Sequence, residues 1–141
     1  MRMTLATGKV GIICCSGEDL PEGTISRVAT RLVLEKLRPD ETVTLCLPLF
    51  LAGGEDERAF ARVFPTVAVD GCSKKCAEAG TRRFSGKPVA TIVVSEVMKK
   101  YPKLKAKSRD KLNSEEMGLA MRVAEEIAKK VDEVLCKKNK K

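Results

Sequence analysis

The sequence predicts an α/β domain in which helices cover both faces of a mainly parallel sheet, giving three layers. Four short runs rich in β-branched residues are apolar almost throughout, as expected for strands covered on both faces. Segments with helical spacing of apolar residues separate these runs, an alternation typical of parallel sheets. A length of 141 residues with 43% hydrophobic composition suits one domain, residues 1–141, of Rossmann-like or flavodoxin-like architecture.

The predicted strands occupy residues 9–14, 42–46, 66–70 and 88–94. We expect the strand order 2-1-3-4, because this order makes the first strand central and sets the second and third strands beside it. The Rossmann-type order 3-2-1-4 is the alternative, and it would move the third strand one place away from the first.

Helical patterns fill the connections between these strands. Apolar residues at helical spacing cover residues 24–37, a shorter helix is expected within 55–64, and another is expected to follow Cys72. The clearest helix covers about residues 113–136, because Asn113 is followed three residues later by a glutamate at capping-box spacing.

A basic loop is predicted between the last strand and the last helix, at about residues 98–112. Within it, residues 98–111 carry seven basic and one acidic side chain, so six of the eight net positive charges lie there. Such charge runs are usually solvated surface, and we expect a lysine-rich loop that the fold does not need.

Cysteines follow three of the predicted strands, in a chain with six cysteines and no histidine. Cys15 and Cys46 end the first two strands and Cys72 follows the third, so the three thiols should meet at the edge where α/β sheets bind ligands. Cys76 would join them, because residues four apart on a helix share a face about 6 Å apart along the axis. We therefore predict one zinc ion held by Cys15, Cys46, Cys72 and Cys76 as thiolates.

The residues around this third strand support a thiolate site. A helix N-terminus stabilises a thiolate, and Cys72 is expected at such a terminus. Lys74 and Lys75 would offset part of the negative charge of four thiolates. Asp70 is expected to cap the helix or to bind the loop amides, and Gly71 suits a tight turn.

The remaining cysteines are expected outside the site. Cys14 points to the opposite face from Cys15 in a regular strand and is assigned to the core, although replacement of Cys15 by Cys14 as a ligand stays open. Cys136 lies at the far end of the last helix and is given no role. The competing interpretation of all these thiols is structural, because free cysteine is commonly buried.

Three motifs resemble those of the DGC-domain family. They are CCSG at residues 14–17, the cysteine within LCLPLFLAGG at 45–54, and VDGC at 69–72 with a second cysteine four residues later. That family is named for its Asp-Gly-Cys motif and is described as zinc-binding through four cysteines. The resemblance covers about residues 9–100 and implies the same four ligands.

The sequence favours a small metal-binding protein whose zinc is structural or serves metal handling or sensing. Iron–sulfur ligation by four cysteines is also allowed. Without histidine there is no Cys-His or Ser-His pair, and no glycine-rich phosphate-binding motif occurs, so no catalytic residue is indicated and we favour a non-enzymatic role.

Two other functions stay open. One is a thiol-based redox enzyme or sensor that uses Cys15 or Cys72. The other is an adaptor that contacts nucleic acid or an acidic partner through residues 98–111. Only Tyr101 could stack on a base there, which disfavours nucleic acid. No protein partner is indicated.

The cellular location is inferred from two further patterns. No apolar run approaches the roughly 20 residues of a membrane span. The first residues contain no cleavage-site pattern of a signal peptide. We therefore expect a cytoplasmic protein with reduced thiols and no membrane association.

Overall fold

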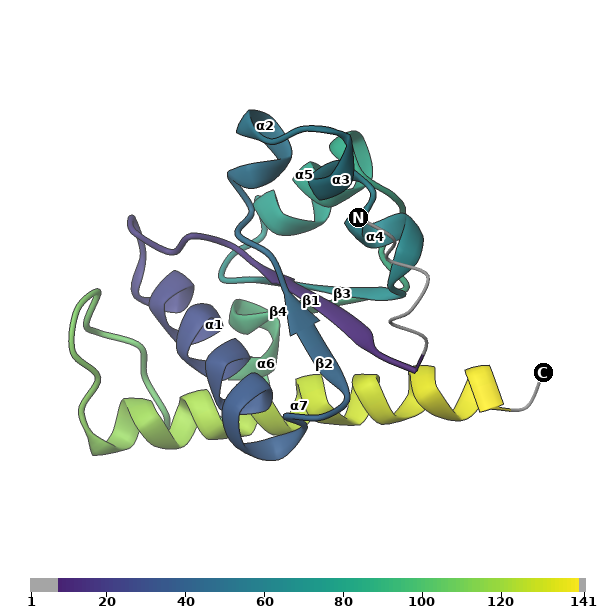
Figure 1. Cartoon of the computed structure of the whole chain (residues 1–141). Coiled ribbons are helices and arrows are strands. Elements are labelled where there is room, and N and C mark those ends of the chain that lie inside the picture. The colour runs from purple at the N-terminus through teal and green to yellow at the C-terminus, as the bar shows by residue number, and fades with distance from the viewer. Residues whose placement is uncertain (1–7, 140–141) are drawn as a thin grey trace.

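The predicted class is confirmed by a computed structural model, which describes residues 8–139 (Figure 1). Four strands form one parallel sheet in the order β2-β1-β3-β4, which is the order expected from the sequence. The strands are β1 Val10–Cys14, β2 Thr42–Thr44, β3 Thr66–Asp70 and β4 Ala90–Val93. The second strand is shorter than predicted, so Cys46 lies two residues beyond its end.

Helical segments connect the strands. They are α1 Pro21–Leu32, the π-helical turn η2 Val33–Leu37, α2 Leu49–Ala52, α3 Glu55–Arg58, α4 Phe60–Val63, α5 Cys76–Phe84, α6 Val94–Val97, the 3-10 turn η3 Met98–Lys100 and α7 Ser114–Asn139. The helix predicted for 24–37 is α1 continued by η2, and the helix predicted within 55–64 is interrupted at Ala59. The sequence did not indicate α2, because four residues are too few for a periodic pattern.

The central strands send alternate side chains into two cores, one on each face of the sheet. Val10 and Ile12 of β1 join the larger core, whereas Ile13 joins the smaller one. Figure 1 shows α1, α6 and α7 against one face, and α2, α4 and α5 on the other. This arrangement confirms the three layers.

The long helix α7 begins as the sequence predicts. The Glu116 N–H donates to Asn113 Oδ1 at 2.8 Å, and the Asn113 N–H donates to Glu116 Oε1 at 3.2 Å, which completes a capping box. One face of α7 closes the larger core, through Leu119, Ala120, Val123, Ala124, Ile127 and Val131. Within residues 8–139, no helix combines the length and the apolarity that a membrane span needs.

The segment between β4 and α7 is attached to the fold, which differs from the expectation of a merely solvated loop. After α6 and η3 the backbone is irregular up to Asn113. Its apolar side chains pack against the larger core, namely Tyr101, Leu104, Ala106 and Leu112. Glu116, only 2% exposed, accepts the N–H groups of Lys107 and Ser108 at 2.8 and 2.7 Å. The sequence shows the charges of this segment, whereas its anchors are single apolar residues between lysines.

Candidate functional site

Three of the four predicted ligands line one cavity at the carboxyl edge of the sheet. The cavity has a volume of about 280 Å³. Cys15 reaches it from the end of β1, Cys72 from the loop after β3, and Cys76 from the start of α5. The Gly17–Leu20 loop before α1 forms the opposite wall. The prediction that separate strands deliver thiols to this edge is therefore supported for Cys15 and Cys72.

Cys46 lies on a second cavity instead, of about 360 Å³, between α1 and the ends of β1 and β2. Cys14 and Cys15 also line this cavity, so Cys15 is common to both. Cys46 is exposed because the chain leaves the sheet after Thr44. Within residues 8–139, no three Cys, Asp or Glu side chains cluster closely enough to hold one metal ion.

The relation expected between Cys72 and Cys76 is wrong. Helix α5 begins at Cys76, so Cys72 precedes it and the two residues do not share a helix face. Between them the chain makes a turn in which the Lys75 N–H donates to the Cys72 carbonyl at 3.2 Å. Lys75 has φ 54° and ψ 51°, the left-handed region that non-glycine residues seldom adopt. Cys76, rather than Cys72, occupies the helix N-terminus.

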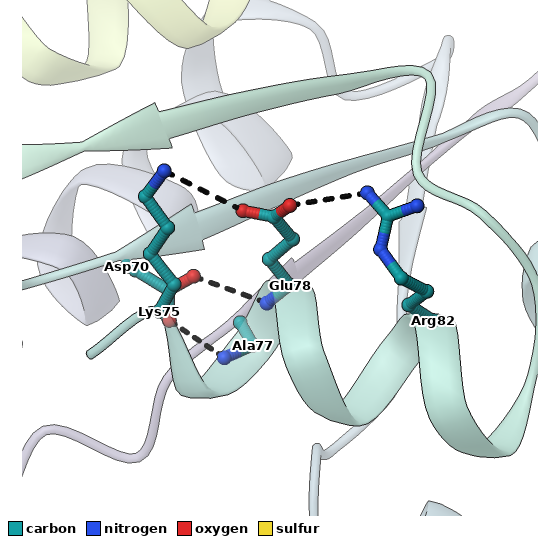
Figure 2. Close-up of polar contacts among 5 residues, drawn as sticks. All are labelled: Asp70, Lys75, Ala77, Glu78 and Arg82. Carbon is teal, nitrogen blue, oxygen red and sulfur yellow. Dashed lines mark hydrogen bonds and ion pairs between the residues drawn. The ribbon is translucent and has the colours of Figure 1, made fainter. Parts of the chain in front are cut away.

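Asp70 determines where α5 starts. Its carboxylate accepts the N–H groups of Ala77 and Glu78, at 2.6 and 3.0 Å, and so satisfies two donors in the first turn (Figure 2). The capping role expected for Asp70 is thus present, although the cap lies six residues before the helix. Burial raises the pKa of Asp70, since these two bonds and the charge of Lys75 offset only part of the desolvation.

The lysines expected to offset thiolate charge both line the cavity. Lys75 Nζ lies 3.9 Å from Glu78 Oε2, and Glu78 also pairs with Arg82 at 3.1 Å (Figure 2). Lys74 makes no ion pair within the part of the chain that the structure describes. Within the described residues Lys74 therefore has no carboxylate partner, unlike Lys75.

Cys15 is half-buried and hydrogen-bonded to α1. Its Sγ lies 3.0 Å from Ser26 Oγ, and the Ser26 hydroxyl donates to the Gly23 carbonyl at 2.6 Å. A protonated thiol can donate to Ser26, and once it is ionised the Ser26 hydroxyl can donate to the thiolate instead. Burial raises the pKa of Cys15, the nearby Asp70 and Cys76 add to this effect, and hydrogen bonds from Ser26 and the Gly71 backbone lower it. Burial likewise raises the pKa of Cys14 to about 11.

Close backbone packing joins the two walls of the first cavity. A Cβ on Gly71 would lie 2.6 Å from the Gly23 nitrogen, and Gly17, with φ +74°, packs against the same residue. Gly71 is therefore required for this contact, rather than for the tight turn that the sequence indicated. Ser26 and Gly23 were not among the predicted site residues. The sequence pattern that could have indicated them is a pair of small residues three positions apart, on the buried face of α1.

The remaining cysteines lie where they were expected. Cys14 packs against the larger core, and Cys136 is exposed near the end of α7. All six cysteines are free.

The family model for the DGC domain matches residues 11–134 of this chain. The chain belongs to the DGC-domain family. The matched region begins in β1 and ends in α7, so it includes both cavities and all of the sheet except the first residue of β1. Comparison with curated proteins, and separately with solved structures, finds no significant match.

In this DGC domain the Asp70-Gly71-Cys72 sequence performs three separate tasks. Asp70 caps α5, Gly71 allows the backbone to approach α1, and Cys72 lines the thiol cavity. Two of the three residues therefore shape the loop, and the third presents a thiol to the cavity.

Proposed function

We propose that this DGC-domain protein binds one zinc ion through cysteine thiolates at the carboxyl edge of its sheet, for a structural role or for metal handling or sensing. The observation that carries the proposal is that Cys15, Cys72 and Cys76 line one cavity, although they come from three places in the fold. With six cysteines and no histidine, the chain offers zinc mainly thiolates, a donor class that zinc accepts.

The donor chemistry fits zinc, whereas the spacing of the donors does not form a ready site. No coordinating cluster of three exists within residues 8–139, and Cys46 lies on the neighbouring cavity. In this proposal the first three ligands are Cys15, Cys72 and Cys76. Cys46 becomes the fourth only if the chain after Thr44 moves toward the cavity. Such movement agrees with metal sites whose binding is coupled to local folding.

Proton release is part of the proposed binding. Burial raises the pKa of the Cys15 thiol, and only a thiolate is a metal ligand, so the thiol proton must leave when a cation binds. Binding should therefore strengthen as the pH rises.

The test is the metal content of anaerobically purified protein, measured for the parent and for single Cys→Ser variants. We expect one zinc per chain in the parent, and loss of metal when Cys15, Cys72 or Cys76 is replaced. Cys136→Ser is the matched control and should keep the metal, because its exposed thiol lies on α7. Cys46→Ser separates a four-thiolate site, which it would disrupt, from a three-thiolate site, which it would not.

Other results would overturn the proposal. Brown protein that contains iron and sulfide would indicate an iron–sulfur cluster. Absence of metal, together with fast alkylation of one thiol, would favour the redox function. That function would then rest on Cys72, because the raised pKa of Cys15 makes Cys15 a poor thiolate at neutral pH.

A further inference from the structure

The segment before α7 presents cations that the fold itself does not pair. We call these residues the basic row: Lys103, Lys105, Lys107, Arg109 and Lys111. All five are exposed, and none forms an ion pair with a carboxylate within residues 8–139. The two preceding lysines differ, since Lys99 and Lys100 pair with glutamates at 3.1 and 2.8 Å.

Exposure alternates along the basic row. Leu104, Ala106 and Ser108 are half-buried, and the cations lie between them in the exposed positions. Leu104 and Ala106 pack against the larger core, so the backbone has one attached side and one charged side. Neighbouring like charges repel one another, and their repulsion is relieved when an anion binds.

The backbone of the row is fixed at two points. Glu116 binds the N–H groups of Lys107 and Ser108, and the Thr24 hydroxyl of α1 donates to the Arg109 carbonyl at 2.9 Å. Both anchors use backbone atoms, which leaves the cationic side chains available. A surface fixed in advance loses less conformational entropy when a partner binds.

We propose that the basic row docks an acidic peptide segment of a partner protein. Charge complementarity identifies the partner as an anion. Nucleic acid fits less well, because no aromatic residue occurs in 102–113 and the Tyr101 ring is already covered by the Arg122 guanidinium at 5.9 Å. Asp110 also interrupts the row. Its negative charge would repel a continuous phosphate backbone more than a peptide whose carboxylates are spaced apart.

The docked segment would lie beside the thiol cavity. The Thr24 hydroxyl, which donates to the Arg109 carbonyl, lies 3.4 Å from the Gly17 carbonyl, and Gly17 lines that cavity. Figure 1 shows the loop before α7 next to the start of α1. No residue of the basic row lines the cavity, so docking does not depend on metal binding.

The test measures fluorescence anisotropy of a labelled peptide of alternating glutamate and serine, at low and at physiological ionic strength. The triple variant Lys103→Gln, Lys105→Gln, Lys111→Gln should weaken binding roughly tenfold, the combined loss of three exposed ion pairs. The matched control is Lys36→Gln, Lys87→Gln, Lys129→Gln, which removes the same charge from exposed, unpaired lysines elsewhere within residues 8–139. We expect the control to change the affinity less than about twofold.

Three results would contradict docking of an acidic peptide. Equal losses in the two triple variants would show an effect of net charge alone. If the parent protein did not bind the peptide at physiological ionic strength, the basic row would not be a docking surface for acidic peptides. Tighter binding of a single-stranded oligonucleotide of the same charge, lost only in the basic-row variant, would identify a nucleic-acid surface instead. Both variants should keep the parent's unfolding temperature, because surface charges contribute little to stability.

Discussion

Two buried carboxylates hold the loop beside the thiol cavity and the basic row, and their pKa values are shifted in opposite directions. Asp70 and Glu116 are each 2% exposed, and each binds backbone N–H groups. The pKa of Asp70 is raised, with burial as the largest cause. The pKa of Glu116 is lowered, because hydrogen bonds from Ser108 and Lys107 outweigh its burial. The pKa values of two similar anchors are thus shifted in opposite directions.

The surroundings of the two groups explain this difference. Glu116 accepts three backbone N–H groups, and the charge of Lys107 adds to their effect. Asp70 accepts two, and the negative charge of Glu78 acts against its ionisation. The surroundings therefore stabilise the negative charge of Glu116 beside the basic row, whereas those of Asp70 beside the thiols disfavour its negative charge. The comparison teaches that burial alone does not decide the state of a capping carboxylate.

The largest effect is expected at the backbone contact that holds the thiol loop. Gly71→Ala would place a methyl group 2.6 to 2.8 Å from backbone atoms of residues 22 and 23, which cannot move aside as a flexible side chain can. We expect the free energy of unfolding to fall by about 3 kcal/mol, as for a strongly overpacked site. Urea unfolding measures this loss.

Gly118→Ala is the control for this substitution. Nothing lies within 4 Å of a Cβ at that position in α7, so alanine should stabilise the protein by about 0.5–1 kcal/mol through its helix propensity. If the two alanines had the same effect, the close approach of Gly71 would not hold the loop.

Glu116→Gln should be next in size, at about 2 kcal/mol of lost stability at neutral pH, because an amide cannot accept all three N–H groups. The lowered pKa gives the sign of the pH effect. Ionised Glu116 stabilises the fold above its ordinary pKa of 4.5, and this contribution is lost as the pH falls from there toward the folded-state pKa. The stability difference between parent and variant should therefore shrink in acid.

The neighbouring exposed Glu115→Gln is the control, with a change within about 0.5 kcal/mol. Chemical unfolding at several pH values measures both variants. A difference for Glu116→Gln that stays constant into acid would show that its hydrogen bonds do not favour the ionised carboxylate.

The smallest effect is expected for Asp70→Asn, about 1 kcal/mol at neutral pH, because the amide loses one N–H bond but removes a buried charge. The pH effect has the opposite sign here. A raised folded-state pKa gives a contribution that is complete below 3.8 and is lost as the pH rises through the folded-state pKa. In chelator-treated protein, the advantage of the parent over the variant should grow in acid.

Parallel pH profiles for Asp70→Asn and Glu116→Gln would remove the contrast between the two anchors. The same unfolding series resolves this, since each variant is an uncharged near-isostere of its carboxylate.

The sequence located the four strands because β-branched runs mark buried strands well, and the expectation of a central first strand gave their order. It placed Cys46 too close to the site, because β-propensity does not reveal that β2 ends at Thr44. The helix after β3 was expected too early, since an Asp70 side chain that caps across an intervening turn leaves no local signal. Similarly, the capping box of Glu116 follows from spacing, whereas its bonds to Lys107 and Ser108 depend on how the loop folds back.

Helix α7 follows all the other described elements in the sequence, and this order has a consequence for synthesis on the ribosome. All elements that carry the thiol cavity are translated by Phe84, whereas the helix that closes the larger core begins at Ser114. Until α7 emerges, the larger core around Val10, Ile12 and Val69 lacks one of the helices that cover it. Exposed apolar surface of this kind makes a nascent chain prone to aggregation. The thiol edge is thus translated while one face of the sheet still needs protection.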